Sequence, residues 1–248
     1  MAENYILYGK GVFTTVCISG GAGLFWDKHW KRLLSNAKKL DIDISQYSYQ
    51  SVLDKLHKIT ITERIDTGRA RISFLDSNPS RLWPSVESPG EVTKLLIEAT
   101  DRLVRETDHK ITTSSFPVNS RSPLVGVKSC NYLEPIMSLD EAKARGFHEA
   151  IRLNECGFVT SACMANVFWV KGGELFTPGL AMGCLAGTTR DFVFENIDCR
   201  EVEVGIEALK DADAIFLTSA GIGVVQVAEF EGRRLEKVDH PILHLLPY

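Results

Sequence analysis

Hydrophobic and polar positions change their period several times along the chain, which is typical of a mixed α/β protein. The N-terminal part passes from a glycine-rich turn into a β-branched strand, and apolar residues at helical spacing then predict two amphipathic helices. Further strands follow, with a serine- and proline-rich loop between the first two of them. The expected elements are a turn and strand at 8–18, helices at 27–40 and 49–59, strands at 69–75, 92–99 and 111–116, and a loop at 76–90.

The C-terminal part is expected to contain more strands and two helices. The first helix is predicted from Tyr132 to Arg145, with Leu133, Ile136, Met137 and Ala144 on its buried side. A Lys-Gly-Gly-Glu turn between two apolar runs is a strong hairpin signal. The other expected elements are strands at 148–153, 158–160, 166–170, 175–178, 201–204, 214–219 and 224–230, and a helix that ends near 196.

A segment without periodicity separates these two parts. The residues from Phe116 to Pro123 include two prolines and no apolar repeat. Such a composition is common in the linkers between domains. We therefore expect an N-terminal α/β domain at residues 1–116, a linker at 117–123, and a C-terminal domain at 124–248 that carries Lys128.

The composition narrows the class of protein. Of the 248 residues 44% are hydrophobic and 24% are charged, and the net charge of -4 argues against a nucleic-acid partner. No apolar run approaches the roughly 20 residues of a membrane span, and the N-terminus does not resemble a secretory signal, so we expect a cytoplasmic protein. The six cysteines form no CxxC pair and no cluster with histidine, so they predict reduced thiols and no metal site.

Lys128 has the most suggestive position for chemistry, because it ends a short apolar run just before the helix predicted from Tyr132. Desolvation and the positive end of the helix dipole would both lower the pKa of its ammonium group. A neutral lysine amine can form a Schiff base. A lysine in such a place is more often an exposed residue whose stem covers a neighbour such as Val127. A reactive role for Lys128 therefore needs support from other parts of the sequence.

Two other segments have the composition of an anion site. Gly187-Thr188-Thr189 precedes a predicted helix, where free backbone N–H groups and the helix dipole favour a phosphate. Thr218-Ser219 ends a buried strand just before Ala220-Gly221, where a backbone nest could form. Each segment alone is equally consistent with ordinary capping. Together with a reactive lysine, they are the groups that an enzyme dependent on pyridoxal 5'-phosphate (PLP) needs.

Several ordered motifs carry a resemblance to a known family. They are Gly-x-Gly-Val-Phe-x-Thr at 9–15, His-x-x-Arg-Leu at 29–33, Lys-x-x-Asn-Tyr at 128–132, three short motifs within 157–178, and Gly-x-Thr-Arg at 187–190. With these motifs the chain resembles the class IV aminotransferases, the PLP-dependent enzymes of fold type IV. This family includes branched-chain aminotransferases, D-amino acid aminotransferases and 4-amino-4-deoxychorismate lyases.

The resemblance implies an α/β (α+β) fold with two domains, as in D-amino acid aminotransferase: a smaller N-terminal α/β domain and a larger C-terminal domain with a β-barrel-like sheet. It also implies PLP as cofactor, a small-molecule amine or amino acid as substrate, and a homodimer. Lys128 would form the Schiff base and carry protons, and Tyr132 would lie near the phenolic oxygen of the cofactor. The residues implied around the phosphate are Arg32, Thr188, Thr189, Thr218 and Ser219.

One departure from the family pattern concerns the residue that faces the pyridine nitrogen of PLP. The family normally has a glutamate five residues before the asparagine of Asn-x-Phe, and this chain has Ser161 there. A serine hydroxyl cannot act as a counter-charge. The carbanion formed on the substrate should then be less stabilised, which disfavours transamination more than β-elimination. Glu155 is a less suitable substitute, because it lies in the preceding turn.

The resemblance to the lyase branch is carried by Phe13-Thr14-Thr15 and by the segments around Phe116 and Trp169. The leading hypothesis is therefore a lyase that converts 4-amino-4-deoxychorismate to 4-aminobenzoate and pyruvate on the folate route. The substrate is a diacid and needs cationic partners, for which Arg81 and Arg121 are the candidates, while Thr14 or Thr15 would face the cofactor or the substrate.

Two alternatives stay open at this stage. One is an aminotransferase acting on branched-chain or D-amino acids. The other is a catalytically weakened pseudoenzyme of the same fold that serves as a partner-binding dimer, which Ser161 and the few residues before Gly9 keep plausible.

Overall fold

The structure of the protein is a computed structural model that describes residues 3–80, 82, 92–101 and 108–246. It divides into two compact units. The first unit comprises Met1–Leu103 and Val127–Tyr132, and the second comprises Val104–Gly126 and Leu133–Tyr248. This division differs from the boundary predicted at 117–123, since the segment with Lys128 groups with the N-terminal part.

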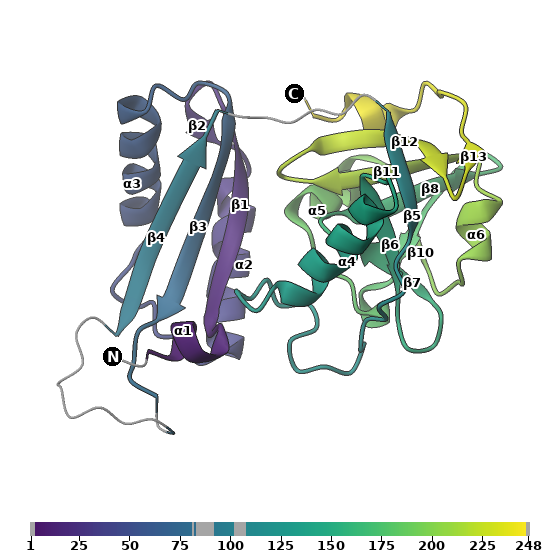
Figure 1. Ribbon diagram of the computed structural model, residues 1–248. Helices are drawn as coiled ribbons and strands as arrows, with labels where there is room; N and C mark the ends of the chain where they lie inside the picture. Colours follow the sequence, from purple (N-terminus) through teal and green to yellow (C-terminus); the bar gives the residue numbers. More distant parts are fainter. Residues whose placement is uncertain (1–2, 81, 83–91, 102–107, 247–248) are drawn as a thin grey trace. The chain divides into compact units, whose positions relative to one another are not determined.

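The first unit is an antiparallel sheet with helices, as the N-terminal pattern predicts (Figure 1). Its strands follow the order β2-β1-β3-β4, and β1 pairs with β3 over eight residue pairs. The bounds are α1 Asn4–Tyr8, β1 Gly11–Ser19, β2 Ala22–Gly23, α2 Trp26–Lys39, α3 Tyr49–Thr62, β3 Gly68–Asp76 and β4 Thr93–Thr100.

Alternation along β1 and β3 divides their side chains between two faces. Val12 and Val16 on β1, with Ile72 on β3, join Leu33 of α2 and Leu56 of α3 in one buried core. The residues between them, which include Phe13, Thr15 and Arg71, therefore project from the opposite face of the sheet. One face of this sheet therefore forms the core of the unit, and the other face carries Phe13, Thr15 and Arg71.

The segment with Lys128 is attached to β1 by backbone hydrogen bonds. The Phe13 N–H donates to the Lys128 carbonyl at 2.9 Å, and the Cys130 N–H donates to the Gly11 carbonyl at 2.8 Å. Val127 is part of the core of the first unit. These contacts explain why Lys128 belongs to the first unit, although the sequence placed it in the C-terminal domain.

The second unit contains a mixed sheet, in which the described strands follow the order β10-β9-β8-β11-β12-β5-β6-β7, with β13 paired to β12 (Figure 1). Strand β5 pairs in parallel with both β6 and β12, so it belongs here and not to the N-terminal domain where it was predicted. The bounds are β5 His109–Thr113, α4 Leu133–Ala144, β6 Glu149–Leu153, β7 Val159–Ala162, β8 Asn166–Lys171, β9 Glu174–Pro178, η1 Leu180–Met182, α5 Thr188–Asn196, β10 Arg200–Val202, α6 Glu207–Lys210, β11 Ala214–Ser219, β12 Gly223–Phe230, β13 Arg233–Arg234 and η2 Pro241–His244.

This sheet is curled, as the expected barrel-like domain requires. Residues from strands that are distant in the sheet, such as Ile151 of β6 and Ile215 of β11, lie in one core. The opposite face of β8 and β11 packs in a second core with Val193 of α5. The mixed α/β fold with a curled sheet thus confirms the predicted fold class.

The buried side of α4 was predicted wrongly. Leu133 and Met137 are 65% and 48% exposed, whereas Ser138 and Ala142 are buried. Small residues at this spacing of four let the helix approach β6 closely, and Ala142 packs with Ala150. Apolar size alone therefore did not identify the inner face.

The cysteines and the helix lengths bear on two predictions made from the composition. All six cysteines are free, in agreement with reduced thiols. Among the residues described, no helix is long and apolar enough to cross a membrane.

Candidate active site

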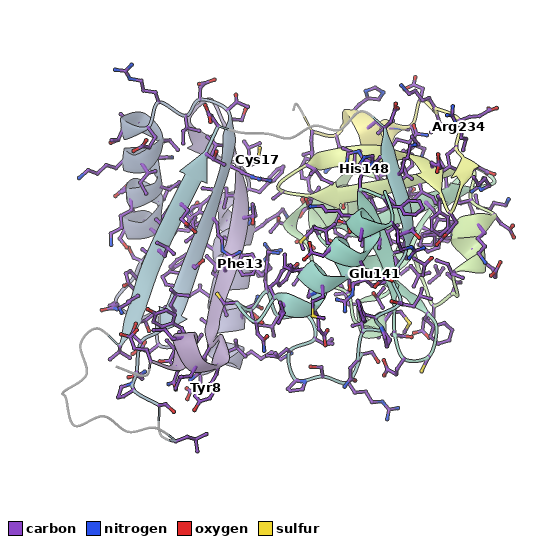
Figure 2. All side chains as sticks on the ribbon, viewed as in Figure 1. Tyr8, Phe13, Cys17, Glu141, His148 and Arg234 are labelled. Carbon is purple, nitrogen blue, oxygen red and sulfur yellow. The ribbon has the colours of Figure 1, made fainter. Side chains whose placement is uncertain are left out.

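Lys128 lies against two aromatic rings of the first unit. Its Nζ is 4.4 Å from the centre of the Phe13 ring and 4.8 Å from that of Tyr132, and the two rings meet edge to face at 5.2 Å. Figure 2 shows the Phe13 side chain on β1. Lys128 as a whole is half-buried.

The protonation of Lys128 is altered by this setting. Burial, followed by the charges of Arg32 and Arg71, lowers the pKa of Lys128 to about 7. Near neutral pH a substantial fraction of the amine is therefore neutral, and only the neutral form is a nucleophile or a base. The sequence predicted the direction of this change and its largest cause, desolvation, but it named a helix dipole as the second cause where the structure has two arginines.

Arg32 is held by a buried polar relay that begins on β1. Arg32 Nη2 donates to Thr14 Oγ1 at 2.8 Å, and Thr14 Oγ1 lies 2.6 Å from His29 Nδ1. Burial, followed by the charges of Arg32 and Lys128, holds the pKa of His29 well below its usual value, so the imidazole is neutral. The hydroxyl can then donate to Nδ1 while it accepts from the guanidinium, which fixes the orientation of Arg32.

The two threonines predicted to face cofactor or substrate are thereby distinguished. Thr14 is fully buried on the side of α2 and contacts Arg32 and His29. Thr15 stands opposite Arg71 in the β1–β3 pair, on the same face as Phe13. Of the two, only Thr15 shares a face with Phe13 and Arg71, whereas Thr14 holds Arg32.

Arg71 is a functional candidate that sequence reasoning missed. Its Cζ lies 3.6 Å from the centre of the Phe13 ring, and its Nε donates to Ser73 Oγ at 3.3 Å. Stacking on an aromatic face orients a guanidinium and leaves its edge able to bind a carboxylate. Arg69 and Arg71 are two residues apart and share a face of β3, so the sequence does not reveal which of them lies beside Phe13. The strand register does.

In the second unit, Asn166 brings the two predicted phosphate-binding segments together. It stands opposite Thr218 in the β8–β11 pair. Its Nδ2 donates to the Leu185 carbonyl at 2.9 Å, and a Cβ added to Gly187 would overlap its Oδ1. Glycine at position 187 therefore allows the start of α5 to approach the end of β11, a role of Asn166 that its motif alone did not indicate.

The groups gathered there fit a phosphate. Thr189 Oγ1 and Thr218 Oγ1 are buried and have no hydrogen-bond partner among the described residues. Helix α5 begins after Gly187, which provides no side-chain cap. Orphaned hydroxyls beside a helix N-terminus are suited to an anion such as the phosphate of PLP. Thr188 is also buried at this helix start.

Other predicted residues of the second unit lie in less specific surroundings. Ser161 is on β7, directly opposite Arg152 of β6. Ser219 Oγ accepts from the Gly221 N–H at 3.3 Å and so closes its own turn. Arg121 is exposed in a loop. Glu155 accepts from the Ser120 N–H and hydroxyl, both at 2.8 Å, and is directed at that loop.

Tyr132 and Arg81 were also predicted as site residues. Tyr132 is in contact with Lys128 and Phe13, as described above. Arg81 lies outside the described residues. Lys128, Arg32, Tyr132, Thr14 and Thr15 belong to the first unit, and Ser161, Thr188, Thr189, Thr218, Ser219 and Arg121 belong to the second.

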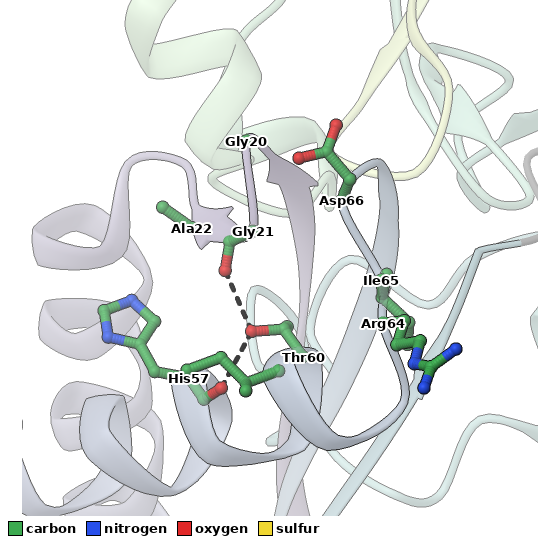
Figure 3. Close-up of a pocket in the computed structure, with 9 residues that line it drawn as sticks. Gly20, Gly21, Ala22, His57, Thr60, Arg64, Ile65 and Asp66 are labelled. Carbon is green, nitrogen blue, oxygen red and sulfur yellow. Dashed lines mark hydrogen bonds between the residues drawn. The ribbon is translucent and has the colours of Figure 1, made fainter.

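A surface hollow in the first unit contains none of the predicted site residues (Figure 3). It is lined by Gly20–Ala22 and by residues at the end of α3, among them His57 and Arg64. Thr60 Oγ1 lies 2.9 Å from the carbonyls of Gly21 and His57, so this hydroxyl is already satisfied by the fold. The described residues also hold no cluster of histidine, cysteine and acidic side chains that could bind a metal.

Comparison with known proteins gives these sites a context. The sequence model of a family described as amino-transferase class IV matches residues 11–230. An aminodeoxychorismate lyase of Bacillus subtilis is 28% identical over 240 residues, which cover 92% of this chain and 80% of that protein. The motifs discussed above all lie within or next to the matched range.

Solved structures agree on the fold. A branched-chain aminotransferase from Thermoproteus uzoniensis with norvaline has a TM-score of 0.86 and 26% identity, covering 98% of this chain and 85% of that one. An aminotransferase from Brucella abortus bound to PLP has a TM-score of 0.83 and 26% identity, covering 98% and 89%. The similar proteins thus include both a lyase and aminotransferases.

Proposed function

This chain belongs to the class IV aminotransferase family of PLP-dependent enzymes, and on that premise we propose that it is a lyase converting 4-amino-4-deoxychorismate to 4-aminobenzoate and pyruvate. The observation that carries the choice of lyase is Ser161 on β7, at the position where the family has a glutamate. The similarity to an aminodeoxychorismate lyase over most of both chains supports it.

PLP, when bound, supplies electron withdrawal from the carbon that carries the substrate amine. In the proposal Lys128 would hold the cofactor through its neutral amine. Burial, followed by the charges of Arg32 and Arg71, supports this role, because it lowers the pKa of Lys128 to about 7. The rings of Phe13 and Tyr132 exclude water from one side of the amine.

The phosphate of PLP is proposed to bind at the start of α5 and the end of β11. Thr189 and Thr218 would donate the hydrogen bonds that they do not make within the fold. Thr188 and Ser219 lie beside them in sequence and are proposed to line the same site. Arg32, oriented by Thr14, is proposed as the cation that neutralises the phosphate.

Lys128 is also the proposed proton carrier. Its free amine would take the proton from the ring carbon that bears the substrate nitrogen. The C–O bond to the enolpyruvyl group then breaks, and its electron pair leaves with the oxygen. A third double bond in the ring completes an aromatic system. Lys128 returns the proton to the enolpyruvate, which becomes pyruvate, so the reaction needs no other reactant.

Ser161 distinguishes the lyase from an aminotransferase in this proposal. A neutral hydroxyl does not stabilise a protonated pyridine ring, so negative charge on the substrate carbon is short-lived. Elimination tolerates this, since the leaving group departs at once and aromatisation drives the step. Transamination requires the charge to persist until the proton is returned elsewhere. Thus the residue facing the nitrogen selects between the two reactions.

The carboxylates of the substrate need cations. Arg71 is proposed for one of them, because it lies beside Phe13 and is close enough to Lys128 to lower its pKa. Thr15, opposite Arg71, is proposed as a neighbouring hydrogen-bond donor. Arg121 and Arg81 remain proposals for the second carboxylate, and a homodimer remains the proposed assembly.

The rival function is an aminotransferase for branched-chain or D-amino acids, which the similarity to a branched-chain aminotransferase structure supports. Incubation of the PLP-loaded protein with 4-amino-4-deoxychorismate separates the two. We expect release of 4-aminobenzoate and pyruvate without added keto acid, and none of either product from Lys128→Ala. Turnover only of an amino acid with a keto acid would show that the argument from Ser161 is wrong. A protein that performs neither reaction would be the pseudoenzyme.

A further inference from the structure

Arg152 is a buried cation to which the proposed function assigns no role. It lies on β6 and is only 5% exposed. Its Nη2 lies 3.3 Å from Glu134 Oε2, but its Nε is buried and has no hydrogen-bond partner in the described part of the chain. Buried donors in native proteins are nearly always paired, so an orphaned donor here points to a ligand.

The ion pair with Glu134 does not explain why Arg152 is buried. The side chain of Glu134 is 74% exposed, so water screens its charge and the pair contributes little to stability. Burying a guanidinium against such a partner is unfavourable compared with an apolar residue. The neighbours Ala150 and Ile151 on the same strand are fully buried apolar residues. A role in packing alone would be served better by another residue of that kind.

The strand register places Arg152 beside Ser161. The two residues are direct partners in the antiparallel β6–β7 pair. Partners of this kind project from the same face with Cβ atoms about 5 Å apart. The adjacent partners Ile151 and Ala162 contribute to the core on the other face. Ala150, two residues before Arg152, packs against Ala142 of α4. Arg152 and Ser161 therefore share the α4 side of the sheet.

This inference rests on the proposed function, in which Ser161 faces the pyridine nitrogen of PLP. We propose that Arg152 is a positioning residue that acts with Ser161 to keep this nitrogen unprotonated. A cation beside the nitrogen disfavours a second positive charge there, typically by 1–3 pH units. The chain would thus have a positive charge near the place where its relatives have a negative one. The pair would suppress transamination more strongly than the serine alone.

The protonation of the ring nitrogen can be read directly by NMR of PLP labelled with ¹⁵N in the pyridine ring and bound to the protein. In the wild type we expect an unprotonated nitrogen at neutral pH. Arg152→Met should raise the apparent pKa of the nitrogen by about 1–3 units. Arg152→Lys keeps a cation and should retain most of the wild-type titration.

A matched control removes another positive charge from the same unit. Arg200 lies on β10 with a side chain that is 68% exposed and paired with Glu174, so Arg200→Met should leave the titration unchanged. Glu134→Gln changes an exposed residue and removes the carboxylate that partly compensates Arg152. It should lower the pKa of the nitrogen further, and it keeps the proposal testable if Arg152→Met does not fold.

The outcomes separate this inference from the proposed function. If the wild type does not take up PLP on Lys128, both fail together. If PLP is bound to Lys128 but its nitrogen is protonated at neutral pH, only the inference about Arg152 fails. The same holds if the Arg152 and Glu134 variants titrate as the Arg200 control does.

Discussion

Protonation of single residues is the basis of the proposed chemistry. The Nζ of Lys128 lies beside the rings of Phe13 and Tyr132, and Arg32 and Arg71 oppose its positive charge. A lysine with a pKa of about 7 is both a nucleophile and a base near neutral pH. The same change has a consequence for stability, because the unfolded chain keeps an ordinary lysine.

The pH dependence of stability tests this change in the protein without PLP. The pKa of Lys128 is lower in the folded than in the unfolded state, so between about 7 and about 10.4 the unfolded state binds more protons. The free energy of unfolding should therefore rise with pH in this range, by at most about 1.4 kcal/mol per pH unit. Water around the half-buried residue should keep the slope below that limit.

The measurement is urea unfolding of wild type and Lys128→Met across this range. Other groups titrate there as well, so the relevant quantity is the difference between the two proteins. It should increase in favour of the wild type as the pH rises above about 7. A difference that does not change with pH would mean that the amine is not desolvated.

The orphaned hydroxyl of Thr218 gives a second prediction. Thr218→Val removes a buried group that has no partner in the fold, so the PLP-free protein should keep its stability or gain up to about 1 kcal/mol. Its affinity for PLP should fall by roughly tenfold or more, because a hydrogen bond to a charged phosphate is lost. PLP titration followed by fluorescence and thermal unfolding would measure the two effects.

Thr177 is the matched control for Thr218, since its buried hydroxyl donates to the Val167 carbonyl at 2.8 Å. Thr177→Val should cost about 1–3 kcal/mol of stability by leaving that carbonyl unpaired, with little change in PLP affinity. Identical behaviour of the two variants would contradict a phosphate site at Thr218.

Helices and strands hold the site residues in position. At the start of α5 this depends on the glycine at position 187. Gly187→Ala would place a Cβ on Asn166 Oδ1, so either α5 or Asn166 must move. We expect a loss of about 1–3 kcal/mol in stability and a drop in PLP affinity of at least tenfold. Gly179→Ala meets only open space at a φ of -63° and should be tolerated in both assays. Equal effects of the two substitutions would argue against close packing at α5.

The turn between β7 and β8 depends on a buried carboxylate of β6. Glu149 Oε1 accepts from the N–H groups of Ala150 and Cys163, both at 2.9 Å, and Oε2 accepts from Met164 at 3.0 Å. Glu149→Gln turns an amide NH₂ toward at least one of these donors and should cost about 1–3 kcal/mol. Glu155→Gln, at an exposed carboxylate, should cost clearly less. Chemical unfolding of both variants would check this, and similar losses would contradict it.

Most elements could be predicted because their periodicity is strong. Helix α3 and strand β11 lie within three residues of the predicted ends. The inner face of α4 could not be predicted, because the small residues Ser138 and Ala142 approach β6 while Met137 stays exposed. Sequence alone also does not fix which strands pair. For this reason β5 was predicted in the N-terminal domain, although it pairs with strands of the second unit.

The site residues divide in the same way into those that sequence motifs identify and those that only the strand pairing identifies. Lys128, Arg32, Thr189 and Thr218 were recognised from motifs that contain them. Arg71 and Arg152 became candidates only when pairing placed them opposite Thr15 and Ser161. An arginine at one strand position faces the site, whereas a shift by one residue would turn it to the other face.

For the molecule as a whole, each unit contributes one part of the chemistry. The first unit carries the lysine with its aromatic and cationic neighbours. The second unit carries Ser161 and the hydroxyls that are proposed to bind the phosphate. The proposed function assigns both sets to PLP, the cofactor of the class IV aminotransferase family. The central claim is that this cofactor is bonded to Lys128.

Borohydride reduction followed by peptide mass spectrometry tests that claim most directly. Reduction fixes PLP to the lysine that holds it, and we predict the added mass on the peptide that contains Lys128. Lys128→Ala should lose the label, whereas Lys143→Ala, at an exposed lysine of α4, should retain it on Lys128. A label on a different lysine of the wild type, or no label after loading with PLP, would contradict the account.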